Sequence, residues 1–229
     1  MADRPDLVIF DCDGVLVDTE RLAIRLEVQL LAELGWDLTE AEIVERFVGI
    51  SDGAMQRAIV EHTGRPLPPG WNEAVRPRYR EMYAAELKAV PGVVDVLDGL
   101  DAAGIATCVA SSGTHDLMAF TLGLTGLADR FAGRIFSATE VEHGKPAPDL
   151  FLHAAARMGA DASRCAVIED SRPGVDAGVS AGMRVLAYGG GVTPPARLTR
   201  QGASVFRDMA ELPALLGLVV GDRPGGISR

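Results

Sequence analysis

The chain has 229 residues, of which 48% are hydrophobic and 24% are charged, and this balance is typical of a folded globular protein rather than a disordered one. Its formal net charge of −10 repels phosphate backbones and anionic membranes. We therefore expect no nucleic acid and no membrane as a partner, and an anionic substrate would need local positive charge at its binding site.

The cysteines and the N-terminal segment bear on the compartment. The three cysteines, Cys12, Cys108 and Cys165, are an odd number and lie in or beside apolar runs, where a thiol usually packs as a small hydrophobic group. The sequence has no signal-peptide pattern and no run of about 18 apolar residues. These features predict a cytoplasmic protein.

The first predicted strand, Leu7–Phe10, is an apolar run that ends at an acidic motif. Asp11, Asp13 and Gly14 follow it, at the edge where doubly wound sheets bind ligands. Two neighbouring carboxylates are costly unless a cation or a proton separates them. We interpret the pair as a metal site with one carboxylate free to act on a substrate, although a simple strand-capping turn would have the same sequence.

Almost a hundred residues separate this strand from the next, and helical patterns fill the gap. Helices are expected at about 19–34, after a capping box formed by Thr39 and Glu42, at about 51–63 and at about 71–87. The sequence thus predicts an all-helical insertion of residues 18–88. The sheet domain would comprise residues 1–17 and 89–220, and residues 221–229 would form a flexible tail.

After the insertion, apolar runs alternate with helical segments of crossover length. The expected strands are Ile105–Ala110, Ile135–Ser137, Ala166–Ile168 and Arg184–Tyr188. The expected helices cover residues 114–124, 148–158 and 174–181. This alternation predicts an α/β fold with a doubly wound parallel sheet.

Two polar motifs lie between these elements. Ser111, Ser112 and Gly113 stand between a strand and a helix, where hydroxyls and helix N-terminal amides bind phosphate well. The same residues would also suit a plain helix cap. Lys145 lies in a proline-rich turn before the next helix, which restricts where its ammonium group points, although exposed turn lysines are common at such positions.

A second acidic pair, Glu169 and Asp170, ends the fourth predicted strand. Taken alone, it would be read as a solvent-facing turn. However, every motif follows a predicted strand, and parallel strands place their carboxyl ends at one edge of the sheet. We therefore expect this pair to converge with the earlier motifs on a single site.

These motifs, in this order, resemble those of the haloacid dehalogenase superfamily, in its phosphatase and β-phosphoglucomutase-like branch. The segment Asp11–Thr19 is similar to the first motif, Ser111 to the second, Lys145 to the third and Glu169–Ser171 to the fourth. The resemblance implies a Rossmann-like sheet domain with a small helical cap over the active site.

The resemblance also implies a mechanism. Asp11 would attack phosphorus to form an aspartyl-phosphate, and Asp13 would protonate the leaving oxygen and later activate water. Mg²⁺ would be held by Asp11, the backbone carbonyl of Asp13 and Asp170, with Glu169 bound directly or through water. The residues expected to bind phosphate are Ser111 and Lys145, with Gly14, Ser112, Gly113 and, from the insertion, Gly49.

The expected substrate is a small phosphorylated metabolite, hydrolysed by a monomer or a homodimer. Its identity should depend on the helical insertion. Candidate residues there are Glu20, Arg21, Arg46, Gly49, Ser51 and Arg57.

Other activities of related folds agree less well with the sequence. A dehalogenase needs neither the metal nor Asp13, and phosphonate hydrolysis needs a lysine in the insertion, which has none between residues 19 and 87. A sugar-phosphate mutase is the main alternative, but such mutases have a histidine at the position of Ala23 and an arginine at that of Asp52, so hydrolysis is favoured. A phospho-accepting signalling receiver is disfavoured because receivers lack a helical insertion.

Overall fold

The computed structural model describes residues 4–48 and 52–218. Within them, six strands form one parallel sheet in the order β3-β2-β1-β4-β5-β6. The strands are β1 (Leu7–Phe10), β2 (Ala106–Ser111), β3 (Ile135–Ser137), β4 (Cys165–Glu169), β5 (Arg184–Tyr188) and β6 (Ala203–Phe206). The predicted doubly wound α/β fold is confirmed, and the five predicted strands are present with ends shifted by at most one residue.

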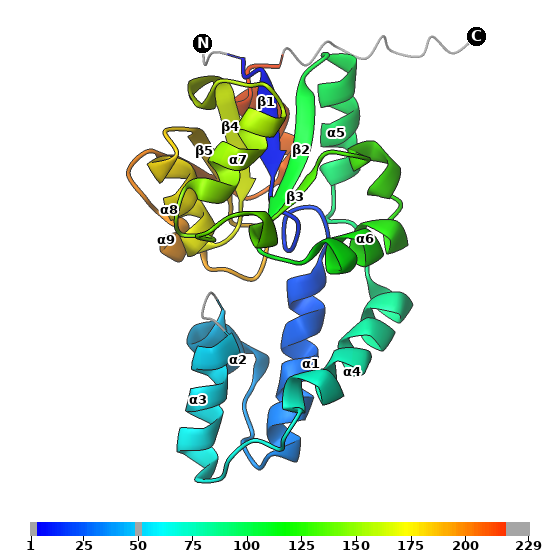
Figure 1. Ribbon diagram of the computed structural model, residues 1–229, viewed down its shortest axis with the longest axis vertical. Helices are drawn as coiled ribbons and strands as arrows, with labels where there is room; N and C mark the ends of the chain where they lie inside the picture. The colour runs from blue at the N-terminus through cyan, green and yellow to red at the C-terminus, as the bar shows by residue number, and fades with distance from the viewer. Residues whose placement is uncertain (1–3, 49–51, 219–229) are drawn as a thin grey trace, which may run out of the picture.

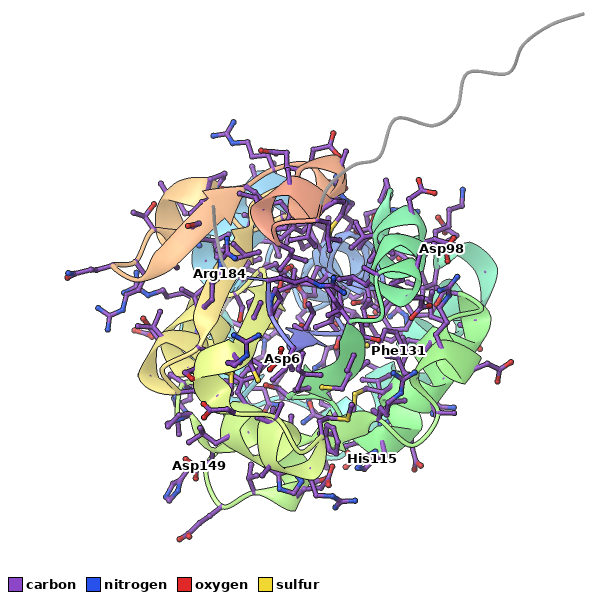
Figure 2. All side chains as sticks on the ribbon, turned by 90° about the horizontal axis from the view of Figure 1, so that it is seen from above. Asp6, Asp98, His115, Phe131, Asp149 and Arg184 are labelled. Atoms are coloured by element: carbon purple, nitrogen blue, oxygen red, sulfur yellow. The ribbon has the colours of Figure 1, made fainter. Side chains whose placement is uncertain are left out.

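Alternating side chains of the strands form two apolar cores, one on each face of the sheet. In β1, Val8 and Phe10 belong to one core, whereas Leu7 and Ile9 belong to the other. The first core is covered by α5 (Val93–Ala102), α6 (His115–Leu124) and α10 (Leu212–Leu215). The second is covered by α7 (Asp149–Arg157), α8 (Arg172–Ser180) and α9 (Pro195–Leu198). Figure 2, which looks along the strands, shows helices on both sides of the sheet.

The remaining helices lie beyond the carboxyl edge of the sheet (Figure 1). They are α1 (Thr19–Glu33), α2 (Glu40–Phe47), α3 (Asp52–Thr63) and α4 (Trp71–Glu86). Residues of α1, α2 and α3 and their loops form an apolar cluster around Leu31, Trp36 and Ile43. The predicted capping box of Thr39 and Glu42 begins α2. We refer to α1–α4 and their loops as the helical insertion.

The chain leaves and re-enters the sheet domain at neighbouring points. Val17 pairs with Ala89, and the amide of Asp18 donates to the carbonyl of Lys88. The domain boundaries, with residues 1–17 and 89–220 in the sheet domain and 18–88 in the insertion, stay a prediction. The predicted tail, residues 221–229, lies outside the described residues.

Two elements have no clear signature in the sequence. The central residues of β6 are exposed, so this edge strand lacks the apolar run that marks the others. The N-cap of α5 is Gly92, which provides no side-chain cap, so no capping motif precedes that helix.

Short 3-10 helices occur at Ala128–Phe131, Ala138–Glu140, Ala162–Arg164 and Met209–Glu211. None of the helices in the described part of the chain has the length and apolar character needed to cross a membrane.

Residues of the loop after β5 and of α9 contact the helical insertion and hold it against the sheet domain. Val192 packs against the apolar cluster of the insertion. The Arg197 guanidinium donates hydrogen bonds to the carbonyls of Val44 (3.1 Å) and Glu45 (2.9 Å). These carbonyls belong to the last turn of α2, where a cation is favourable for the helix dipole.

Replacing Arg197 with alanine should loosen the insertion without disturbing the sheet. The two lost hydrogen bonds should reduce the free energy of unfolding by about 1 kcal/mol, and amides of α2 should exchange faster with solvent while those of β1 and β4 should not. Arg200→Ala is the matched control, because Arg200 pairs with Asp176 inside the sheet domain at 2.9 Å. Unchanged exchange in α2 of Arg197→Ala would contradict this role.

Candidate active site

Three neighbouring strands deliver the predicted residues to one place. Asp11 follows β1, Ser111 ends β2 and Glu169 ends β4, and β1 lies between the other two strands. Lys145 reaches them from the segment before α7, with its Nζ atom 2.5 Å from Asp11 Oδ1 and 2.7 Å from Glu169 Oε1. The structure thus brings together side chains that lie far apart in the sequence.

Lys145 is the buried cation of this site. Its side chain is only 4% exposed, and its ammonium also donates to the Ala110 carbonyl at 3.1 Å and lies 4.9 Å from the centre of the Phe151 ring. Burial opposes the charge, but the carboxylates of Asp11 and Glu169 outweigh it and raise the pKa of Lys145. The lysine therefore remains charged. It supplies the local positive charge that an anionic substrate would need in this acidic protein.

The pKa values of Asp11 and Asp13 are both raised. Burial raises the pKa of Asp11 to about 7 against the lowering effect of Lys145, with Glu169 and Asp13 adding to the rise. Burial also raises the pKa of Asp13, although its Oδ1 accepts a hydrogen bond from the Thr19 hydroxyl at 2.7 Å. A carboxyl that holds a proton more readily than usual is suited to give and take one during a reaction.

Both oxygens of Glu169 have partners within the protein. Oε1 accepts from Lys145, and Oε2 accepts from the Ser171 amide at 2.7 Å and the Ser171 hydroxyl at 2.9 Å. Gly174 lies directly against this carboxylate, because a Cβ atom there would come within 1.7 Å of Oε1. Glu169 is therefore held in place and in turn holds Lys145.

Asp170, by contrast, is buried with an oxygen that lacks a partner. Its Oδ2 atom and Glu20 Oε2 have no hydrogen-bond partner among the described residues, and the two side chains interact closely enough to shift each other's pKa. Burial raises the pKa of Asp170, and the charges of Glu20, Glu169 and Asp11 raise it further. Gly14, with φ of 76°, leaves room for this carboxylate, since a Cβ atom would lie 1.9 Å from Oδ2.

This arrangement fits a divalent cation. Buried carboxylate oxygens without partners are the hard ligands that Mg²⁺ prefers. No group of three acidic, histidine or cysteine side chains with metal-binding spacing occurs in residues 4–48 and 52–218. The predicted set comprises the carboxylates of Asp11 and Asp170, the backbone carbonyl of Asp13, and Glu169 bound directly or through water.

The predicted phosphate-binding loop lies beside the two aspartates. Ser111 is 2% exposed and its hydroxyl accepts a hydrogen bond from the Gly113 amide at 3.0 Å. A Cβ atom on Gly113 would lie 3.8 Å from Asp13 Oδ2. Thr114 caps α6 by accepting from the Leu117 amide, so the loop leads directly into a helix N-terminus.

Some predicted residues lie elsewhere or are not described. Gly49 and Ser51 lie outside the described residues. Arg46 lies over the Trp36 ring, 6.0 Å from its centre, and Arg21 donates to the Gly190 carbonyl at 3.0 Å. Both arginines are therefore engaged within the protein.

Cys12, between the two aspartates in sequence, is fully buried in the apolar core. Burial raises the pKa of its thiol, which agrees with a packing role.

For two residues of the site, no partner can be predicted from the sequence. Thr19 is expected there only as the start of a helix, yet its hydroxyl contacts Asp13. Glu20 is a candidate for substrate recognition, yet it pairs with Asp170. The only available signal is their place in the first turn of the helix that follows the aspartate motif.

Known proteins resemble this chain over most of its length. Residues 5–182 match the haloacid dehalogenase-like hydrolases. The 6-phosphogluconate phosphatase of Escherichia coli is 31% identical over 186 residues, which cover 81% of this chain and 83% of the relative. A probable pseudouridine-5'-phosphatase of Drosophila melanogaster is 34% identical over 203 residues, covering 86% and 84%.

Among solved structures, a HAD family hydrolase from Deinococcus radiodurans with bound phosphate and sodium superposes with a TM-score of 0.82. It is 32% identical, and the match covers 95% of this chain and 99% of that one.

Proposed function

Because the chain belongs to the haloacid dehalogenase-like hydrolases, we propose that it is a Mg²⁺-dependent phosphatase of a small phosphorylated metabolite. The observation that carries the proposal is the buried Lys145 ammonium, which joins Asp11 and Glu169 at the carboxyl edge of the sheet. A cation placed there neutralises a phosphoryl group beside an anionic nucleophile.

In the first step, an Asp11 oxygen attacks phosphorus, and the bond from phosphorus to the leaving oxygen breaks. Asp13 gives its proton to that oxygen, so the alcohol leaves neutral and Asp11 carries the phosphoryl group. Lys145 and the Ser111 hydroxyl hold the non-bridging oxygens. The Thr19 hydroxyl keeps the Asp13 carboxyl oriented toward the reacting atoms.

In the second step, Asp13 takes a proton from water, whose oxygen attacks phosphorus and releases Asp11 and inorganic phosphate. Asp11, Asp170 and the Asp13 carbonyl would hold Mg²⁺, with Glu169 acting only through water because both its oxygens have protein partners. The bound ion supplies charge neutralisation for the phosphoryl oxygens and the clustered carboxylates.

Water is the proposed final acceptor rather than a second sugar phosphate. The supporting residues are Ala23, where mutases have a histidine, and Asp52, where they have an arginine. The relatives with phosphatase names support the same choice. We further propose that the protein acts in the cytoplasm as a monomer or a homodimer.

Phosphate release from a panel of phosphomonoesters tests the function. We expect turnover with Mg²⁺ on at least one sugar phosphate or sugar-acid phosphate, and loss of turnover with a chelator. The panel should include 6-phosphogluconate and pseudouridine 5'-phosphate, together with β-glucose 1-phosphate and a bisphosphate activator. Isomerisation without phosphate release would overturn the hydrolase assignment.

A further inference from the structure

Behind the phosphate-binding loop lies a polar network that the proposed mechanism does not use. Ser137 ends β3 and is paired in register with Ser111 at the end of β2. Its side chain is fully buried, and its hydroxyl donates to the Gly113 carbonyl at 2.7 Å. The Thr139 amide and hydroxyl donate to the same Ser137 hydroxyl oxygen at 3.2 and 3.0 Å, which fixes the direction of the Ser137 proton.

Glu140 connects this serine to the other end of the loop. Its Oε1 atom accepts from the Ser137 amide at 2.7 Å and lies 2.9 Å from Nε2 of His115, the first residue of α6. Its Oε2 atom lies 3.1 Å from Nε2 of His153 on α7. In Figure 2, His115 lies at the periphery of the sheet domain, away from the central strand, so these contacts support the loop from outside.

Charge and burial agree with a fixed arrangement. Burial alone would raise the pKa of Glu140, but hydrogen bonds from the Ser137 amide and the two histidine rings hold it below its ordinary value. The carboxylate therefore accepts on both oxygens at neutral pH. The His153 ring also packs edge-on against Phe136, with centroids 5.7 Å apart, which anchors the network to β3.

We propose that Ser137 and Glu140 are positioning residues for phosphate binding. Ser137 holds the Gly113 carbonyl and Glu140 holds the His115 ring, so the loop from Ser111 to His115 is fixed at two points by one short segment. The same segment continues to Lys145. The segment from Ser137 to Lys145 therefore sets the distance between the Ser111 hydroxyl and the Lys145 ammonium, which hold the phosphoryl oxygens. The inference rests on the proposed function, since it concerns the same site.

The test compares Ser137→Ala, Glu140→Ala and Glu140→Gln with wild type. Inorganic phosphate is the binding probe, p-nitrophenyl phosphate gives KM and kcat, and hydrogen exchange reports on amides 112–115. We expect about tenfold weaker phosphate binding and a similar rise in KM for both alanine variants, with faster exchange in the loop. Glu140→Gln should recover part of the loss, because its side-chain oxygen can still accept from the Ser137 amide.

Glu142→Ala is the matched control, since Glu142 is exposed in the same segment and should behave as wild type. Altered melting temperatures with wild-type phosphate affinity and loop exchange in all three variants would overturn the inference, because that pattern indicates a purely structural role. A wild-type protein that hydrolyses no phosphomonoester would instead contradict the proposed function. Loop exchange would still decide whether Ser137 and Glu140 position the loop.

Discussion

The Asp11→Asn variant is expected to lose phosphatase activity by roughly 10⁴-fold or more in kcat, because the amide cannot act as the nucleophile toward phosphorus. Asparagine has the same shape, and its carbonyl oxygen can still accept the hydrogen bond that Lys145 donates to Oδ1. The fold should therefore be retained. Phosphate release under saturating substrate, together with a melting curve, measures both effects.

Asp13→Asn separates the two chemical steps. With p-nitrophenyl phosphate the leaving group needs no proton, so phosphorylation of Asp11 should remain fast while attack by water slows by about 10²–10⁴-fold. The expected signature is a burst of nitrophenol equal to the enzyme concentration, followed by slow turnover. With an alkyl phosphate both steps should be slow and no burst should appear.

Asp18→Asn is the control for both variants. Asp18 belongs to the same segment but pairs with the exposed Arg21 at 3.3 Å. Its replacement should change kcat by no more than about threefold. Full activity in Asp11→Asn would refute the nucleophile assignment, and equal losses in Asp11→Asn and Asp18→Asn would indicate a general disturbance of the segment.

The site could be predicted from the sequence where strand ends define it. Asp11, Ser111 and Glu169 each follow an apolar run, and a parallel sheet must bring the carboxyl ends of its strands to one edge. The same rule predicts that the later motifs meet the first one. Lys145 is a further case, since a proline-rich turn before a helix leaves its side chain few directions.

Contacts between the helical insertion and the sheet domain cannot be predicted from local sequence patterns. Arg197 bonds with Val44 and Glu45, which are distant in the sequence, and no local pattern encodes that meeting. The pairing of Glu20 with Asp170 has the same origin, because it requires the register of α1 over β4. β6 was missed for a different reason, since an exposed edge strand has no apolar run.

The Asp170→Asn variant should be more stable than wild type in the absence of divalent cations, yet inactive. Asp170 is 1% exposed, and its Oδ2 atom lacks a hydrogen-bond partner among the described residues. Burial and the carboxylates of Glu20, Glu169 and Asp11 raise its pKa. Replacing this carboxyl with a neutral amide should add about 0.5–2 kcal/mol to the free energy of unfolding, or roughly 2–6 °C in melting temperature.

The stability difference between Asp170→Asn and wild type should depend on pH. As pH rises above the ordinary aspartate pKa of 3.8, the unfolded chain releases the Asp170 proton before the folded protein does, so wild type loses stability through this window. The asparagine of the variant does not titrate. The advantage of the variant should therefore be small near pH 3 and should grow toward pH 7, while the contributions of all distant groups cancel in the comparison.

Mg²⁺ should make wild type more stable than Asp170→Asn, which reverses the order of their melting temperatures. A ligand that binds only the folded state stabilises it in proportion to the logarithm of its concentration over Kd, and wild type retains both carboxylates of the proposed site. At millimolar Mg²⁺ and pH 7, the melting temperature of wild type should rise, whereas that of Asp170→Asn should change little. Equal stabilisation of both proteins would mean that Asp170 is not a ligand. If Asp170→Asn instead melts at a lower temperature than wild type without metal, the buried Asp170 carboxyl does not destabilise the metal-free protein. That result would contradict the prediction.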